Sequence, residues 1–279
     1  MERKKFKDLN LSNAFLFAAA LTDEETCSIV LELVLGKKFP QISVKTEHAI
    51  FFSSDFRSVR FDVYAKDETE VSYDLEMQTK DQGNLPKRAR FYQAEMDVTS
   101  LKPGEDFNDL KPSYVIFICT FDPFGDGLYQ YTFEEVCREN NRALGDETVK
   151  IFLNTKGKND SEVPCALVEL LKYIESSTDD CAREASDPNV QKLHEKVMLL
   201  KKSRELEENY MHLTDWLEEE RREGRAEGRV EGHAEGCAET QQNFLKLISL
   251  MTQDGMLDDI PRLSQDLQFL EEMFQKYNL

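Results

Sequence analysis

Hydrophobic positions along the first 160 residues follow both the helical and the strand period. Helical spacing covers two consecutive segments within 11–36, where Asp23 is a suitable N-cap for the second helix and Gly36 lies near its end. Another helix is predicted over 85–101, with Pro86 in its first turn. Short runs rich in β-branched and aromatic residues predict strands at 42–51, 58–66, 71–79, 111–121, 128–135 and 148–156.

The order of these elements predicts the fold class. Helices, three strands, a helix and a further strand are typical of an α/β fold with a mixed sheet flanked by helices. The run at 111–121 is apolar almost throughout, which indicates a strand buried on both faces. After about residue 160 the spacing becomes helical, with Val190, Leu193 and Val197 along one face. A helical C-terminal extension is therefore expected to follow the sheet.

Four segments follow from this change of pattern: a core at 1–160, a helical extension at 161–222, a glycine and glutamate repeat at 223–240, and a small helical element at 241–279. The repeat, EGRAEGRVEGHAEGCAE, has glycine at every fourth position. On a helix these glycines would form a groove for another helix, but each costs roughly 1 kcal/mol relative to alanine. A hinge is predicted for the repeat, with a continuous helix as the alternative.

Composition narrows the cellular setting. No apolar run is long enough to span a bilayer, which takes about 20 residues, so no membrane association is expected. The six cysteines are scattered, without a Cys-x-x-Cys pair or a metal-like spacing to the four histidines. This pattern is typical of a reduced, cytoplasmic protein.

The formal net charge of −19 argues against nonspecific coating of nucleic acid, because phosphate binding depends on lysine and arginine. The charge is uneven, since residues 1–160 contribute −7 and residues 161–279 contribute −12. A local basic patch within residues 1–160 therefore remains compatible with the composition.

Two of the predicted strands carry carboxylates among apolar neighbours, namely Asp62 in RFDVYA and Glu76 in YDLEMQ. Because side chains alternate along a strand, Glu76, Gln78 and Lys80 share one face, and Asp62 lies beside Glu76 if the register allows it. Adjacent carboxylates repel unless a cation such as Mg²⁺ lies between them. The alternative interpretation is that Asp62 and Glu76 both face solvent. Acids are frequent in this sequence, and Asp55, Asp67 and Asp74 are further examples.

The helix at 85–101 follows the acid-bearing strand and offers several polar side chains. Arg88 and Tyr92 are spaced i, i+4 and share one helix face, whereas Arg90 lies on a different face. Arginine, tyrosine and glutamine suit contact with a phosphate backbone. A solvated amphipathic helix is the alternative interpretation.

These motifs together resemble the Rpn family of recombination-promoting nucleases and transposases, a branch of the PD-(D/E)XK nuclease superfamily. The resemblance is carried by FLF and LELVLG near the N-terminus, RFDVYA, DLEMQ, LPKRARFYQAEMD and the apolar strand YVIFIC. The order D…E-x-Q followed by KRxRxYQ is its most specific part, and the repeat and the helical C-terminus also fit. The fold it implies is a restriction-endonuclease-like core over about 1–160.

The resemblance implies a metal-dependent DNA endonuclease that hydrolyses phosphodiester bonds and is linked to recombination or mobile elements. In that superfamily an aspartate and a glutamate on neighbouring strands hold Mg²⁺ or another divalent cation such as Mn²⁺, and these positions correspond to Asp62 and Glu76. Gln78 stands where the motif usually has lysine, and its amide would orient the attacking water. Lys80 is the candidate for the missing positive charge.

Contacts to DNA are expected from the following helix, through Arg88, Arg90, Tyr92 and Gln93. Two other classes of function stay open. A catalytically impaired relative would bind only DNA or a protein partner, as the glutamine at the lysine position and the acidic charge suggest. An oligomerisation or regulatory protein would use the helical C-terminal region, through which a homo-oligomer is also expected.

Overall fold

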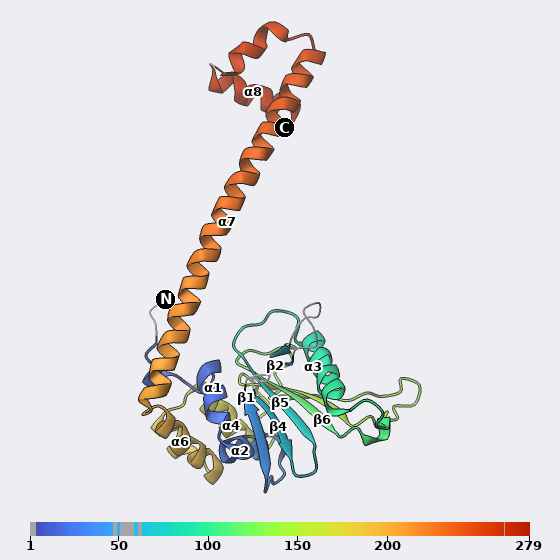
Figure 1. Ribbon diagram of the computed structural model, residues 1–279, viewed down its shortest axis with the longest axis vertical. Coiled ribbons are helices and arrows are strands. Elements are labelled where there is room, and N and C mark those ends of the chain that lie inside the picture. Colours follow the sequence, from blue (N-terminus) through green and yellow to red (C-terminus); the bar gives the residue numbers. More distant parts are fainter. Residues whose placement is uncertain (1–3, 47–48, 51–58, 61–62, 265) are drawn as a thin grey trace. The chain divides into compact units, whose positions relative to one another are not determined.

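The computed structural model describes residues 4–46, 49–50, 59–60, 63–264 and 266–279 (Figure 1). The chain divides into two compact units, Met1–Tyr210 and Met211–Leu279. The first contains the sheet, and the second contains helices.

A mixed six-stranded sheet forms the centre of the first unit. Its strands are β1 (Ile42–Thr46), β4 (Val63–Asp67), β5 (Ser72–Gln78), β6 (Ser113–Cys119), β7 (Gln130–Phe133) and β8 (Thr148–Asn154). They lie in the order β1-β4-β5-β6-β8-β7, with β5, β6 and β8 mutually parallel and the other pairings antiparallel. A separate antiparallel pair is formed by β2 (Ala49–Ile50) and β3 (Val59–Arg60).

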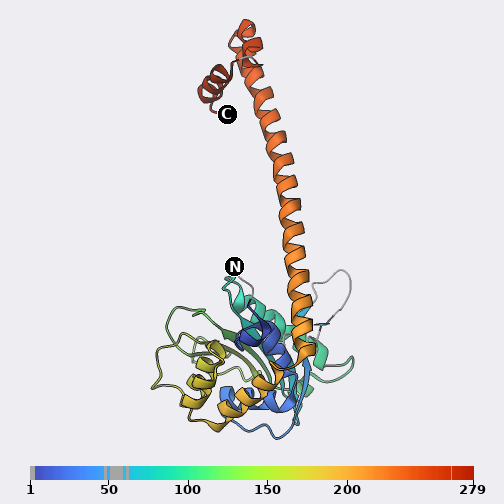
Figure 2. The same ribbon diagram turned by 90° about the vertical axis from the view of Figure 1, so that its left-hand side faces the viewer.

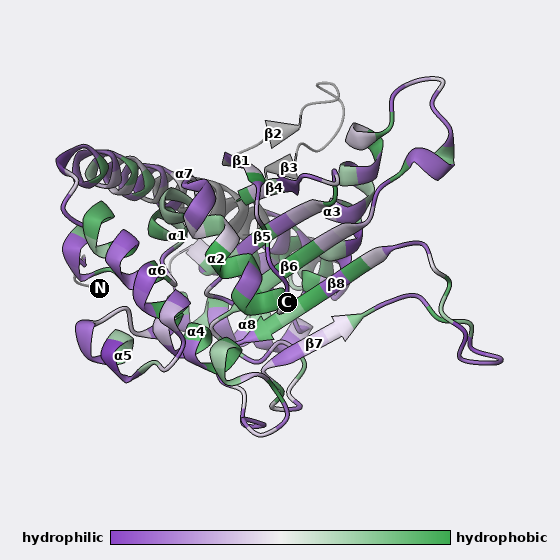
Figure 3. Ribbon diagram, turned by 90° about the horizontal axis from the view of Figure 1, so that it is seen from below, coloured by the Kyte–Doolittle hydropathy of each residue, from purple (hydrophilic) through white to green (hydrophobic). Residues whose placement is uncertain are grey.

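Helices cover both faces of the six-stranded sheet, which confirms the predicted fold class (Figure 1). One face carries the helices α1 (Ala14–Leu21), α2 (Glu24–Leu35), α4 (Cys165–Glu175) and α6 (Pro188–Leu200). The other face carries α3 (Leu85–Ser100). The larger hydrophobic core lies on the first side and includes Tyr73 and Leu75, while the smaller core on the α3 side includes Phe117 and Phe152. Figure 3 shows hydrophobic residues along β6, as predicted for a strand buried on both faces.

Local sequence sets the ends of the helices as predicted. Asp23 caps α2, because its Oδ2 accepts hydrogen bonds from the backbone N–H and the hydroxyl of Thr26 at 3.0 and 2.7 Å. Gly36 ends the helix in the left-handed conformation, with φ of 67°, which glycine adopts without the steric penalty of a Cβ. Pro86 lies in the first turn of α3, where no intrahelical bond needs its missing N–H.

The first unit continues beyond residue 160. Leu170 of α4 and Leu193 of α6 are fully buried in the larger core, and the short helix α5 (Asp179–Glu184) packs beside them. Tyr210 lies against the rings of Phe6 and Phe15, with centroid distances of 5.8 and 5.5 Å. The helices α4, α5 and α6 therefore belong to the same compact body as the sheet.

The glycine repeat lies within α7 (Arg204–Gln253), which is continuous through it (Figure 2). Of the two structures that the pattern left open, the continuous helix is the one observed. Residues 222–225 are exposed, and a Cβ added to Gly224 would meet no atom within 4 Å. The hinge prediction requires the helix to open within the repeat, and the low helical preference of the glycines favours such opening.

The second unit has a small core of its own. Leu247 and Met251 of α7 pack there with Leu263 of a 3₁₀ helix (Leu257–Ser264) and Phe269 of α8 (Leu267–Tyr277). Asp266 caps α8 by accepting a hydrogen bond from the backbone N–H of Phe269 at 3.0 Å. No helix in the described part of the chain combines the length and the apolar character needed to cross a membrane.

Glu169 on α4 holds the connection between α5 and α6. Its carboxylate accepts hydrogen bonds from the backbone N–H groups of Ser186 and Asp187 at 3.0 and 2.9 Å. Burial alone raises the pKa of Glu169, but these bonds and that of the Ser186 hydroxyl outweigh it and lower the pKa to about 2. A group with a depressed folded-state pKa stabilises the protein above its ordinary pKa, and this stabilisation disappears as the pH falls towards the folded value.

We therefore expect the melting temperature to fall as the pH drops from about 4.5 to about 2, and to fall less in Glu169→Gln than in the parent chain. At neutral pH the variant should be the less stable of the two, because it has lost the charged acceptor. Glu184→Gln, at an exposed position of α5, is the control and should follow the parent curve. Identical pH dependence in Glu169→Gln and the parent would contradict this assignment.

Limited proteolysis tests the repeat. We expect the first cuts within 221–240, because its glycines weaken α7 there. Gly224→Ala should slow this cleavage, since alanine favours the helix by roughly 1 kcal/mol and its Cβ has open space. Gly36→Ala, at a positive φ, should instead destabilise the first unit and leave cleavage of the repeat unchanged. Early cuts inside the sheet with a protected repeat would show that the repeat is a packed helix.

Candidate active site

Alternation along β5 places its polar residues on the side of α3. Tyr73, Leu75 and Met77 belong to the larger core on the opposite side. The residues between and beside them share the face beneath α3: Ser72, Asp74, Glu76 and Gln78. Asp74 is 0% exposed and Glu76 is 1% exposed. Two acidic side chains are thus buried on one face of a single strand.

This face opens at the carboxyl ends of the parallel strands. Gln78 is the last residue of β5 and pairs with Cys119, the last residue of β6. The neighbour of β5 on its other edge is β4, and the described pairing of these two strands ends with Val63 and Leu75. Ligands of open α/β sheets commonly bind at this edge. The acidic face therefore ends at the sheet edge where ligands of such folds commonly bind.

Arg88 of α3 binds both of the candidate residues on β5. Its Nη2 donates to Oε2 of Glu76 at 3.0 Å, and its Nη1 donates to Oε1 of Gln78 at 2.9 Å. The side chain of Glu76 is 2% exposed and that of Arg88 is 24% exposed. A buried carboxylate needs a partner that offsets its lost hydration. The guanidinium is that partner for Glu76, and it connects the buried acid to the rim of the site.

Two aromatic rings support the guanidinium. Nη2 of Arg88 donates a hydrogen bond to the hydroxyl of Tyr92 at 2.9 Å. The guanidinium carbon lies 5.4 Å from the ring centroid of Tyr92 and 5.4 Å from that of Phe117 on β6. Burial and the charge of Glu76 raise the pKa of Tyr92, and the contact with Arg88 offsets only part of this rise. Tyr92 therefore remains a neutral hydroxyl in the physiological range.

The other candidate residues lie apart from this cluster. Lys80 follows the end of β5 in an exposed bend, so the alternation that joins Glu76 and Gln78 does not extend to it. Arg90 is exposed on a different face of α3. Gln93 is buried, where its Nε2 donates to the hydroxyl of Ser113 and its Oε1 has no hydrogen-bond partner among the described residues.

Asp62, the remaining candidate, lies outside the described residues.

Asp74 shares the strand face of Glu76, and Phe117 lies beneath the guanidinium of Arg88, but neither was predicted from the sequence. Asp74 stands two residues before Glu76, and this spacing alone puts both on one strand face. The abundance of acids in the chain, with Asp and Glu at 54 of 279 positions, conceals that signal. Phe117 gives no local signal, because its contact with Arg88 depends on the pairing of β5 with β6.

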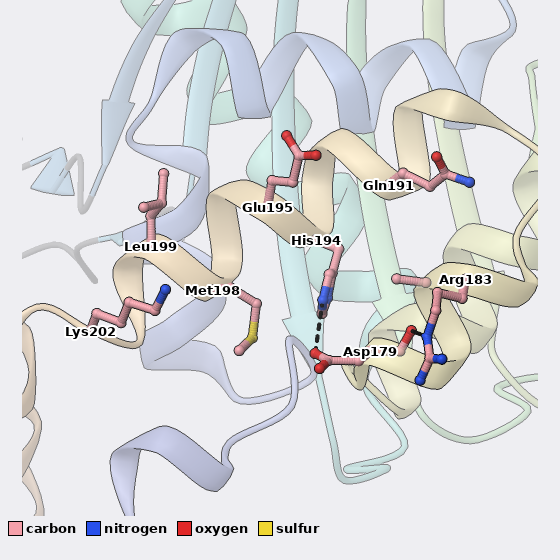
Figure 4. A pocket seen from close by; sticks show the side chains of 9 residues that line it. Asp179, Arg183, Gln191, His194, Glu195, Met198, Leu199 and Lys202 are labelled. Carbon is pink, nitrogen blue, oxygen red and sulfur yellow. Dashed lines mark hydrogen bonds and ion pairs between the residues drawn. The ribbon is translucent and has the colours of Figure 1, made fainter.

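A separate hollow lies on the opposite side of the sheet. It is a cavity of about 690 Å³ lined by residues of α5, α6 and the adjoining turn: Asp179, Ala182, Arg183, Gln191, His194, Glu195, Met198, Leu199 and Lys202 (Figure 4). His194 lies between the hydroxyl of Tyr173 at 3.0 Å and Oδ1 of Asp179 at 3.1 Å. These bonds join α4, α5 and α6 to one another. The cavity is therefore separate from Glu76 and Arg88.

The mixed sheet, its helical layers and its acid-bearing strand are consistent with the restriction-endonuclease-like class of α/β proteins. A comparison with known families agrees: the profile described as PD-(D/E)XK nuclease family transposase matches residues 23–221. The chain belongs to this family, and the match includes both β5 and α3. Membership supports a nuclease-type hydrolase. No curated protein and no solved structure matches the chain.

The burial of Gln93 predicts a structural effect that its exposed neighbour lacks. Gln93→Ala should lower the free energy of unfolding by about 1–3 kcal/mol, because it removes the bond to Ser113 and leaves a void. Arg90→Ala is the matched control on the same helix and should change it by less than about 0.5 kcal/mol. Urea unfolding measures both. An equal loss in the two variants would contradict the assigned faces of α3.

Proposed function

We propose that the chain is a Mg²⁺-dependent DNA endonuclease that hydrolyses phosphodiester bonds and is linked to recombination or mobile elements. The observation that carries this proposal is the cluster of Glu76, Gln78 and Arg88 at the carboxyl end of β5, in a chain of the PD-(D/E)XK nuclease family transposases. Carboxylate and amide oxygens suit a hard cation, and a guanidinium suits a phosphate.

The donor atoms on β5 fit a divalent cation. Glu76 offers a carboxylate and Gln78 an amide oxygen on the same strand face, and Mg²⁺ and Mn²⁺ both prefer oxygen ligands. Asp74 adds a second buried acid on this face, which increases the attraction for a cation. Among the described residues, no group of three or more His, Cys, Asp or Glu side chains has a metal-binding arrangement.

Asp62 is the proposed second ligand, with Glu76 as the first. Support comes from the antiparallel register of β4 and β5, in which Val63 pairs with Leu75. Asp62 directly precedes Val63, and Glu76 directly follows Leu75. If this register continued by one pair, Asp62 would stand opposite Glu76.

A bound Mg²⁺ or Mn²⁺ would polarise the scissile phosphate and lower the pKa of a coordinated water. The amide of Gln78, which Arg88 positions before metal binds, would orient the attacking water. Lys80, exposed just past the end of β5, would place a positive charge near the phosphate. Glu76 would hold its carboxylate in a setting from which bulk water is excluded.

Binding of the DNA backbone is proposed for α3. Arg90 is exposed on α3. Arg88 and Tyr92 lie on the face of α3 that is turned towards the sheet, and both are partly exposed. Gln93, expected to contact DNA directly, would act from its buried position by orienting α3 against β6. These few contacts would work against the overall charge of −19, so binding should be weak and should depend only moderately on salt, because the salt dependence scales with the number of phosphates contacted.

A catalytically impaired relative that only binds DNA or a protein is the first alternative. Gln78 cannot carry the charge of the usual lysine, and its amide oxygen already accepts a hydrogen bond from Arg88. DNA binding without metal-dependent cleavage would favour this alternative.

Self-association through the helical C-terminal region is the second alternative, and it is also compatible with nuclease activity. Several large apolar side chains on α7 are exposed, including Met211, Trp216 and Leu217. Exposed apolar surface of this kind is often covered by a partner. Stable self-association with neither DNA binding nor cleavage would favour a regulatory or oligomerisation protein, and a cytoplasmic location suits all three proposals.

A plasmid-nicking assay tests the endonuclease directly. We expect cleavage with Mg²⁺ and none with EDTA, and we expect Glu76→Gln and Asp62→Asn each to reduce the rate by about a hundredfold or more, because each removes a charged metal ligand. Gln78→Ala and Lys80→Ala should slow cleavage while metal binding persists. Glu68→Gln, at an exposed turn before β5, is the matched acid-to-amide control and should cut like the parent. Parental cleavage by Glu76→Gln would exclude the proposed site.

A further inference from the structure

Arg88 is bound to the same oxygen atoms that the proposed metal site would use. Its Nη2 lies 3.0 Å from Oε2 of Glu76, and its Nη1 lies 2.9 Å from Oε1 of Gln78. A guanidinium and a divalent cation are both attracted to such oxygens, and they repel each other at close range. The two cations therefore compete for one position.

The charge balance of the site explains why an arginine stands there. Asp74 and Glu76 are both buried on one face of β5. Buried carboxylates are costly unless a nearby cation stabilises their charged form. Arg88 supplies that cation for Glu76, and arginine stays charged throughout the physiological pH range. The charge of Glu76 is therefore balanced without any bound metal.

The guanidinium also has partners that a metal would leave in place. It contacts the hydroxyl of Tyr92 at 2.9 Å and lies over the rings of Tyr92 and Phe117. Aromatic faces attract an arginine side chain without using carboxylate oxygens. Since the Arg88 side chain is 24% exposed, a guanidinium that has left Glu76 can stay on these rings at the rim of the site.

We propose that Arg88 is the resident counter-ion of the metal site. It positions Glu76 and Gln78 while no metal is bound, and it gives up their oxygens when a divalent cation binds. This inference rests on the proposed function, and it adds Arg88 to Lys80 as a source of the positive charge that the motif's lysine would carry. Arg88 is a positioning residue in this role, because it acts through Glu76 and Gln78.

Titration calorimetry with Mg²⁺ alone, without DNA, tests the competition. Arg88→Gln should bind Mg²⁺ about tenfold more tightly than the parent chain, because the competing cation is gone. Its melting temperature without metal should be lower than that of the parent, because Glu76 has lost its ion pair with Arg88. Saturating Mg²⁺ should recover most of this difference. If Arg88 had only a structural role, Arg88→Gln would lower the melting temperature by the same amount with and without Mg²⁺. It would also leave the Mg²⁺ affinity unchanged.

Two further variants keep the test decisive. Lys87→Gln removes one positive charge at an exposed position of the same helix and should keep the parental Mg²⁺ affinity. Arg88→Lys keeps the charge but loses the paired hydrogen bonds, so its affinity should lie between those of the parent and Arg88→Gln. If Arg88→Gln does not fold, the Mg²⁺ affinity of Arg88→Lys is compared with that of the parent instead, and it should be the higher of the two.

The outcomes separate this inference from the proposed function. Equal or weaker Mg²⁺ binding in Arg88→Gln, with a parent chain that binds Mg²⁺, would overturn the counter-ion role and leave the metal site standing. The same holds if Lys87→Gln tightens binding as much as Arg88→Gln does. A parent chain that binds no Mg²⁺ would instead overturn the metal site itself, and the counter-ion role with it.

Discussion

The ion pair between Glu76 and Arg88 is the interaction on which the α3 side of the molecule depends. Glu76 sits in a central strand of the sheet with 1% of its surface exposed, so its charge has to be balanced from within the protein. The balance comes from a residue that is distant by 12 positions and lies on another element. The pair connects α3 to β5, and the bond to Gln78 adds a second point of attachment.

The sheet is consequently different on its two faces. On the side of α1, α2, α4 and α6, β5 contributes Tyr73, Leu75 and Met77 to a continuous apolar core, which supplies most of the burial in the first unit. On the side of α3, the same strand contributes acids and an amide, while β6 contributes apolar residues such as Phe117. Stability comes mainly from the first face, so the second can accommodate the desolvation of charged groups.

Much of the fold was predictable because it depends on local patterns. The strands and helices up to α4 follow from side-chain periodicity, and Asp23 and Gly36 follow from helix-capping preferences. The alternation of Glu76 and Gln78 was visible for the same reason. The partner of Arg88 was not, because it depends on how α3 docks on the sheet. A local pattern can also mislead, as Gly224 shows. Glycine lowers helical preference, but it does not by itself end a helix, and α7 continues through this position.

A positive charge on a helix differs in its consequences from one fixed on the strand. A lysine at the position of Gln78 would hold its charge beside Glu76 whether or not metal is present. Arg88 reaches the acid from α3 through a long side chain, with the rings of Tyr92 and Phe117 as a second resting place. In the proposed site, a cation on Glu76 would make the guanidinium available to a phosphate, and a phosphate that holds the guanidinium would make Glu76 available to a cation. By linkage, each would strengthen the binding of the other, so metal and DNA would bind cooperatively.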